Sequence, residues 1–187
     1  MSHVPLELTK LTKRYGKEPG IEVIDLIIEP GEVFGFLGPN GAGKTTTIRT
    51  IMNFIRPSSG SAAVFGLDSV KDATEVKSRV GYLAGDFQMY ENLTGRQYLE
   101  FIANLRGTKD ADKEIAQLSK ALEANLNKKV HTLSRGNMQK IALISALLHD
   151  PDLLILDEPT TGLDPLMQNE FYQLVKERTK RGKTVFM

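Results

Sequence analysis

The sequence contains no cysteine, no signal peptide and no long apolar run, and each absence excludes a class of protein. Without cysteine the chain has neither disulfides nor thiolate metal ligands, which fits a reducing cytosol. The first ten residues, MSHVPLELTK, lack the apolar segment that a signal peptide needs. Runs such as LLIL at 153–156 are far shorter than the roughly 20 residues of a membrane-spanning helix. We therefore predict a protein that does not cross a membrane by itself.

An excess of charge of one sign is also missing. The chain has 24 Lys and Arg against 23 Asp and Glu, which gives a net charge of +1. No general basic field would attract nucleic acid or acidic lipid, so we expect no nucleic-acid partner. At 187 residues the chain is long enough for one domain with a substantial core.

The order of the predicted elements indicates the fold class. Strand patterns occur at residues 6–11, 21–28, 33–37, 62–65, 80–83 and 153–156, and helical patterns at residues 43–55, throughout 94–149 and from Asp164-Pro165 to just before Gly182. The helical block opens at Thr94 with a capping box. Strands with crossover helices that flank a helical block predict an α/β core carrying an α-helical insertion.

A glycine-rich loop predicts nucleotide binding. GPNGAGKT at 38–45 fits G-x-x-x-x-G-K-[ST] and stands between a predicted strand and a predicted helix. Glycines let backbone N–H groups turn inward around an anion, and the new helix presents its positive end to the phosphates. Lys44 can reach the β- and γ-phosphates, and the Thr45 hydroxyl can bind Mg²⁺. The candidate ligands of the nucleotide in this loop are Gly38, Pro39, Asn40, Gly41, Ala42, Gly43, Lys44, Thr45 and Thr46.

An apolar run ending in two acids, LLILDEP at 153–159, predicts a hydrolysis site. A buried parallel strand delivers its C-terminal residues to the ligand crevice, at the same sheet edge as the phosphate loop. Asp157 would then hold Mg²⁺, and Glu158 would polarise the attacking water. The alternative is a strand that simply ends in two solvated acids.

A third motif, LSRGNMQK at 133–140, precedes PDLLILDEPTTGLDP and identifies a family. The motif resembles the LSGGQ signature of ATP-binding cassette (ABC) ATPases, and the resemblance covers essentially the whole chain. Tyr15 matches the aromatic residue that stacks on adenine in that family; the alternative for a lone strand tyrosine is packing. The resemblance implies a P-loop NTPase (RecA-like) core with an N-terminal antiparallel β subdomain and an inserted α-helical signature subdomain.

The resemblance also implies a mechanism. ABC ATPase domains work as head-to-tail pairs, so Ser134 and Gly136 would meet the ATP held by a partner subunit. Lys44 and Glu158 would be the catalytic residues, and Mg²⁺ would lie at Thr45 and Asp157. The pair would power transport through a separate transmembrane permease, from the cytoplasmic face of the membrane. The sequence looks most like the bacterial branch that serves drug and other ABC-2-type exporters.

Two stretches depart from the family pattern. The signature has Arg135 in place of a glycine and Asn137 in place of glutamine. In VGYLAGDFQMY at 80–90, the glutamine of the family's Q-loop is missing. Gly85, Asp86 and Gln88 remain candidates for its place.

The C-terminal stretch KTVFM reads as the start of a strand over residues 184–187. In the family a histidine follows this strand directly, whereas the histidines of this chain are His3, His131 and His149. We therefore expect one ATPase domain that is truncated before this histidine and impaired in turnover, with an exposed strand edge beside Val185 and Phe186. Residues 1–88 and 150–187 would form the nucleotide-binding core with its β subdomain, and residues 89–149 the helical subdomain.

Two other functions are weighed against transport. A soluble ABC protein acting on ribosomes or DNA usually has tandem cassettes, coiled-coil insertions or basic extensions, and the sequence shows none of these. A GTPase would need a guanine-reading N-K-x-D motif, and a kinase a phosphoacceptor lobe; neither is present.

Overall fold

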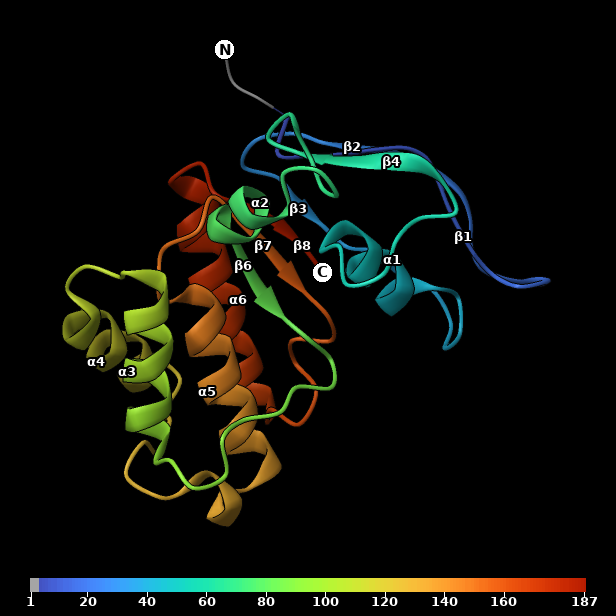
Figure 1. Cartoon of the computed structure of the whole chain (residues 1–187). Coiled ribbons are helices and arrows are strands. Elements are labelled where there is room, and N and C mark those ends of the chain that lie inside the picture. Colours follow the sequence, from blue (N-terminus) through green and yellow to red (C-terminus); the bar gives the residue numbers. More distant parts are fainter. Residues whose placement is uncertain (1–3) are drawn as a thin grey trace.

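The computed structural model, which describes residues 4–187, contains two four-stranded sheets (Figure 1). The first sheet is antiparallel, with strand order β2-β1-β4-β5. Its strands are β1 (Leu6–Tyr15), β2 (Glu18–Ile28), β4 (Ser59–Val64) and β5 (Leu67–Asp68). A tight hairpin joins the first two strands, and Gly16 adopts the positive φ of 61° that such turns favour. This sheet confirms the predicted antiparallel β unit near the N-terminus.

The second sheet is parallel, with strand order β3-β8-β7-β6. Its strands are β3 (Val33–Phe34), β6 (Val80–Leu83), β7 (Leu153–Leu156) and β8 (Thr184–Phe186). All four residues of β7 are buried, as expected for a central strand covered on both faces. The last strand in sequence therefore lies inside this sheet, next to one of the first.

The position of β8 corrects one expectation. Its two edges are both paired: Val185 aligns with Val33 of β3, and Phe186 aligns with Ile155 of β7. Val185 and Phe186 are fully buried, and the ring of Phe186 stacks on that of Phe34 at a centroid distance of 5.9 Å. The predicted exposed edge beside these residues is wrong, because the strand order brings a segment from residues 33–34 onto it.

The helices follow the predicted order with one addition, the short helix α2. They are α1 (Lys44–Ile51), α2 (Ala73–Arg79), α3 (Gly95–Arg106), α4 (Ala111–Ala121), α5 (Arg135–Leu147) and α6 (Pro165–Lys180), with a 3₁₀ turn at Val130–Thr132. The sequence reading missed the short elements α2 and β5. It also made the first helix too long, since Asn53 turns to a φ of 51° just beyond Ile51. The helical block over 94–149 is confirmed.

Two helix starts confirm their sequence signals. Thr94 and Gln97 form a complete capping box at the start of α3. Asp164 caps α6 by accepting a hydrogen bond from Met167 N at 3.0 Å, and Pro165 occupies the first turn. Both caps satisfy backbone N–H groups that a helix leaves free at its start.

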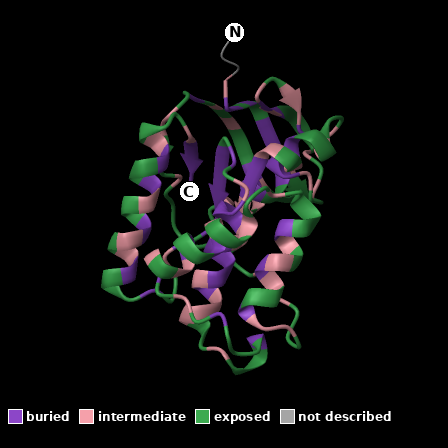
Figure 2. Ribbon diagram, turned by 90° about the vertical axis from the view of Figure 1, so that its left-hand side faces the viewer, coloured by how far each residue is buried: buried purple, intermediate pink, exposed green. Residues whose placement is uncertain are grey.

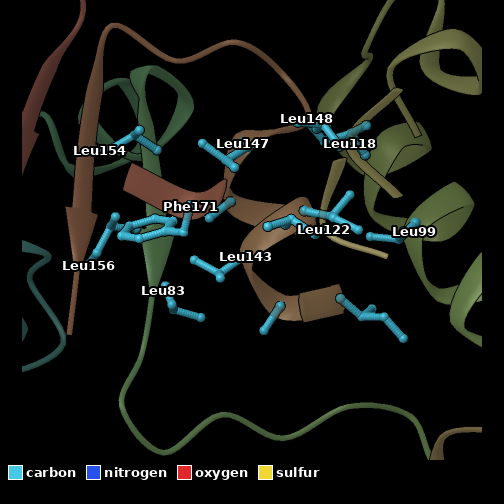
Figure 3. Packing of buried hydrophobic residues seen from close by; sticks show 14 of the residues in the cluster. Leu83, Leu99, Leu118, Leu122, Leu143, Leu147, Leu148, Leu154, Leu156 and Phe171 are labelled. Atoms are coloured by element: carbon cyan, nitrogen blue, oxygen red, sulfur yellow. The ribbon is translucent and has the colours of Figure 1, made fainter. Parts of the chain in front are cut away.

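Hydrophobic clusters cover both faces of the parallel sheet. Alternate residues of β7 face opposite ways: Leu153 and Ile155 belong to a cluster shared with the antiparallel sheet and α1, and Leu154 and Leu156 to a cluster shared with the helices. Figure 3 shows the second cluster, in which Leu154 and Leu156 lie close to Phe171 of α6. The buried residues run along the strands and along the inner faces of the helices (Figure 2). The helical block thus shares a core with the parallel sheet. The boundaries that separate a helical subdomain (89–149) from the nucleotide-binding core (1–88 and 150–187) stay a prediction.

Over residues 4–187, no helix combines the length and the apolar character that a membrane span requires.

Candidate nucleotide-binding site

The glycine-rich loop leads from the end of β3 into α1. Gly41 and Gly43 have φ values of 82° and 89°, in the left-handed region that favours glycine. A Cβ atom on Gly43 would also collide with the carbonyl oxygen of Gly20 on β2. The residue before α1 must therefore be glycine for two reasons, its conformation and its close approach to the antiparallel sheet.

Lys44 is the first residue of α1, and its side chain folds back over the loop. Its Nζ donates hydrogen bonds to the carbonyl oxygens of Gly38 and Pro39, at 2.5 and 3.0 Å. The ammonium group thereby lies over the loop that would surround a phosphate. A phosphate oxygen could accept a hydrogen bond from this ammonium group in place of these carbonyl oxygens.

Thr45 and Asp157 meet although 112 residues separate them. The Thr45 hydroxyl donates to Asp157 Oδ2 at 2.7 Å, and Asp157 is only 4% exposed. Asp157 follows β7 directly and its backbone N–H donates to Leu83 O of β6 at 2.9 Å, which fixes its position at the sheet edge. A hydroxyl beside a carboxylate fits Mg²⁺, which takes oxygen ligands and commonly only one or two from the protein.

Glu158 lies on the rim of the same site. It is exposed and lines a cleft of about 320 Å³ together with Lys44, Thr45 and Tyr15. The Thr161 hydroxyl donates to Glu158 Oε2 at 3.2 Å, which steadies the carboxylate. The two acids after β7 therefore have different environments: Asp157 is buried against Thr45, and Glu158 faces the open cleft.

Tyr15 stands at the other end of this cleft, at the tip of the β1–β2 hairpin. Its side chain is 52% exposed, and Lys13 Nζ lies 5.2 Å from the centre of its ring. A Cβ on Gly20 would come within 2.7 Å of the ring, so the ring packs against this glycine. Such a half-open ring suits stacking on a flat base.

Sequence reasoning missed Pro19 and Gly20, which also line the cleft. The glycine was a detectable signal, because a glycine within a strand often marks a close approach of two backbones.

Ser134 and Gly136 lie at a different place, the start of α5. Ser134 caps this helix, accepting a hydrogen bond from Asn137 N at 3.2 Å. A Cβ on Gly136 would come within 2.7 Å of the carbonyl oxygen of Gly162, in the loop before α6. Neither Ser134 nor Gly136 lines the cleft of Lys44 and Tyr15. The structure thus brings Tyr15 and the acids after β7 to the phosphate loop, whereas Ser134 and Gly136 lie apart from it.

Gly85, one of the three candidates for the missing glutamine, lies beside Asp157. A Cβ on Gly85 would be 3.2 Å from Asp157 Oδ2. Tyr82 on the same segment has its pKa raised by burial and by the charge of Asp157. Asp86 and Gln88 are exposed.

Neither His131 nor His149, the histidines among residues 4–187, lines the cleft. His131 Nδ1 lies 3.0 Å from Glu91 O, and His149 Nε2 lies 3.3 Å from Val80 O. Burial lowers the pKa of His149 to about 4. His3 is outside the described residues.

A parallel sheet with a glycine loop after one strand and an acidic pair after another defines the P-loop NTPase fold. Comparison with known proteins then identifies the family. The sequence profile described as "ABC transporter" matches residues 21–161, so the chain belongs to the ABC transporter family. The predicted fold and family are both confirmed.

Curated relatives match nearly the whole chain. The Escherichia coli protein named "Probable multidrug ABC transporter ATP-binding protein YbhF" is 36% identical over 186 residues, covering 97% of the chain and 32% of the relative. NatA of Bacillus subtilis is 37% identical, covering 96% and 77%. BcrA of Bacillus licheniformis, a bacitracin transport ATP-binding protein, is 38% identical, covering 97% and 60%. The chain thus spans from a third to about three quarters of the length of these relatives.

Solved structures agree in fold. The ATP-binding subunit of an ABC transporter superposes with a TM-score of 0.88 at 27% identity, covering 97% of this chain and 78% of the other. The ATP-binding cassette MJ0796, solved as a dimer with ADP and Pi in a post-hydrolysis state, gives a TM-score of 0.86 at 26% identity, covering 97% and 86%.

Proposed function

We propose that the protein binds Mg²⁺-ATP in the cleft between Tyr15 and Lys44 and hydrolyses it. The contact of Thr45 with Asp157 at 2.7 Å is the observation that supports this most strongly. It joins the phosphate loop to the acid after β7, and Glu158 lines the same cleft. The similar cassette solved with ADP and Pi supports the same chemistry.

Each group would have a separate part in the reaction. Tyr15 would stack on the base, and the backbone N–H groups of residues 38–46 would surround the phosphates together with the Lys44 ammonium. Thr45 and Asp157 would hold Mg²⁺, which would neutralise charge that develops on the phosphate oxygens. Glu158 would orient the attacking water and accept its proton, as an exposed carboxylate close to the phosphate loop can do.

Hydrolysis would require a second copy of the domain. Ser134 and Gly136 lie at a helix start, a favourable place for an anion, but outside the cleft of their own chain. In a head-to-tail pair they would contact the ATP held by the partner. The dimeric state of the similar cassette supports such a pair.

Transport would be the use of this energy. Two of the relatives named above, YbhF and BcrA, are named as ATP-binding proteins of multidrug and bacitracin transport. We propose that this protein likewise lies at the cytoplasmic face of a membrane, bound to a separate permease that it drives.

Replacement of Lys44 tests the assignment. Lys44→Ala should weaken ATP binding at least tenfold, about 1.4 kcal/mol, because the triphosphate loses its main compensating cation. Titration with a fluorescent ATP analogue measures this, and Lys17→Ala, a change of an exposed lysine that lies outside the cleft, is the matched control. Unchanged affinity in Lys44→Ala would overturn the proposed site.

A further inference from the structure

Gln139 is a buried amide on α5 that points toward the loop after β7. The residue is only 5% exposed. Its Nε2 donates a hydrogen bond to Pro159 O at 2.9 Å and lies 3.5 Å from Glu158 O. Since a buried amide is costly unless it is paired, this contact ties the turn to the helix that begins at Ser134.

The turn needs such a tie because Glu158 is held in an unfavourable conformation. Its φ is 48°, in the left-handed region that a residue with a side chain rarely adopts. The following residue is a proline, which normally drives the preceding residue toward extended backbone. Strain of this kind persists only when surrounding contacts determine the conformation.

Other backbone hydrogen bonds hold the turn within itself and at its start, and the Thr161 hydroxyl contacts only the Glu158 carboxylate. Thr161 N donates to Glu158 O at 3.2 Å, and Asp157 N donates to Leu83 O at 2.9 Å. Neither contact fixes Pro159 O, whose partner is Gln139. Without this partner, the buried carbonyl of Pro159 would lose its hydrogen bond, and the turn could relax toward extended backbone. The Glu158 carboxylate would then leave the rim of the cleft.

We propose that Gln139 is a positioning residue for hydrolysis, which holds Glu158 in the left-handed conformation that directs its carboxylate into the cleft. The inference rests on the proposed function, because it assumes that Glu158 orients water there. It also gives a route from the start of α5 to Glu158, since Gln139 lies one turn beyond Ser134 and Gly136 on the same helix. A displacement of that helix would move the turn that carries Glu158.

The test compares two glutamines whose amides both donate to carbonyl groups of the segment between β7 and α6. Gln139→Met removes the bond to Pro159 O, and Gln168→Met removes a similar bond to Leu163 O, 3.1 Å long, which does not hold Glu158. In the natural full-length protein we expect Gln139→Met to lower kcat about 10- to 100-fold, as for a displaced catalytic group, with KM for ATP changed less than about threefold. Gln168→Met should leave kcat within about twofold, and thermal melting shows whether both variants fold.

Gln139→Glu keeps the size of the side chain and separates positioning from packing. An ionised carboxylate cannot donate to Pro159 O, whereas a protonated carboxyl can, and burial raises its pKa. Its turnover relative to wild type should therefore rise as the pH falls from about 8 to about 6. A constant ratio, or normal kcat in Gln139→Met, would overturn the positioning role and leave the proposed function intact. No ATP turnover in the wild-type protein would overturn the proposed function and this inference together.

Discussion

The cleft at Lys44 and the surface at the start of α5 both offer groups that suit a phosphate, but they differ in completeness. In the cleft, groups from separate segments contact one another: Lys44 folds over its loop, and Thr45 meets Asp157. At the start of α5, Ser134 is exposed and caps its own helix, and Gly136 faces Gly162 of the same chain. Under the proposed function, this difference implies that one chain would bind the nucleotide, whereas the second surface would contact a nucleotide brought by another molecule.

The largest expected effect comes from replacing the proposed catalytic carboxylate by an amide of the same shape. Glu158→Gln should lower ATP turnover at least about 100-fold, because the amide cannot accept a proton or orient water by its charge. ATP affinity should stay within about twofold of wild type, and an ATP-bound dimer should accumulate. Phosphate release and size-exclusion chromatography with ATP measure the two outcomes. Turnover at the wild-type rate would remove Glu158 from the catalytic role.

A smaller effect should follow from disturbing the second surface. Gly136→Ala adds a methyl group that would lie 2.7 Å from Gly162 O. The start of α5 and the loop before α6 must therefore move apart. We expect turnover to fall about 10- to 100-fold, as for misplaced catalytic groups, with ATP binding to the single chain unchanged. Parallel binding and turnover assays separate these quantities. An equal loss of binding would show that the two surfaces are not independent.

The smallest effect concerns the base. Tyr15→Ala should weaken ATP binding by about 1–2 kcal/mol, roughly 5- to 30-fold, whereas Tyr15→Phe should be nearly neutral. The reason is that phenylalanine keeps the aromatic ring that would stack on the base, whereas alanine removes it. Equal losses in both variants would indicate a role for the hydroxyl, and no loss in either would assign Tyr15 to packing.

The sequence predicted best what local chemistry determines. The glycines of the phosphate loop, the cap at Asp164 and the apolar strand before Asp157 each have a signal within a few residues, and the structure has the corresponding elements. Their meeting could be anticipated too, because parallel strands deliver their carboxyl ends to one edge of a sheet.

Contacts that depend on strand order could not be read from the sequence. Nothing local indicates that β8 lies between β3 and β7, so its edge was expected to be exposed. The approach of Gly85 to Asp157 and the hydrogen bond from Gln139 to Pro159 O are likewise contacts between distant segments. The sequence around a helical glutamine does not show whether its side chain is exposed or is buried against a strained turn.

The dependence of turnover on protein concentration tests the central comparison most directly. ATP binding and phosphate release are measured on the natural full-length protein across concentrations that span its monomer–dimer equilibrium. Sedimentation measures the dimer fraction at each concentration. If one chain binds ATP and two chains are needed to hydrolyse it, the fraction of sites that bind ATP at saturation stays constant. Turnover per molecule then rises with the dimer fraction. Constant turnover per molecule in the monomeric range would contradict the account, because a single cleft would then be sufficient for hydrolysis.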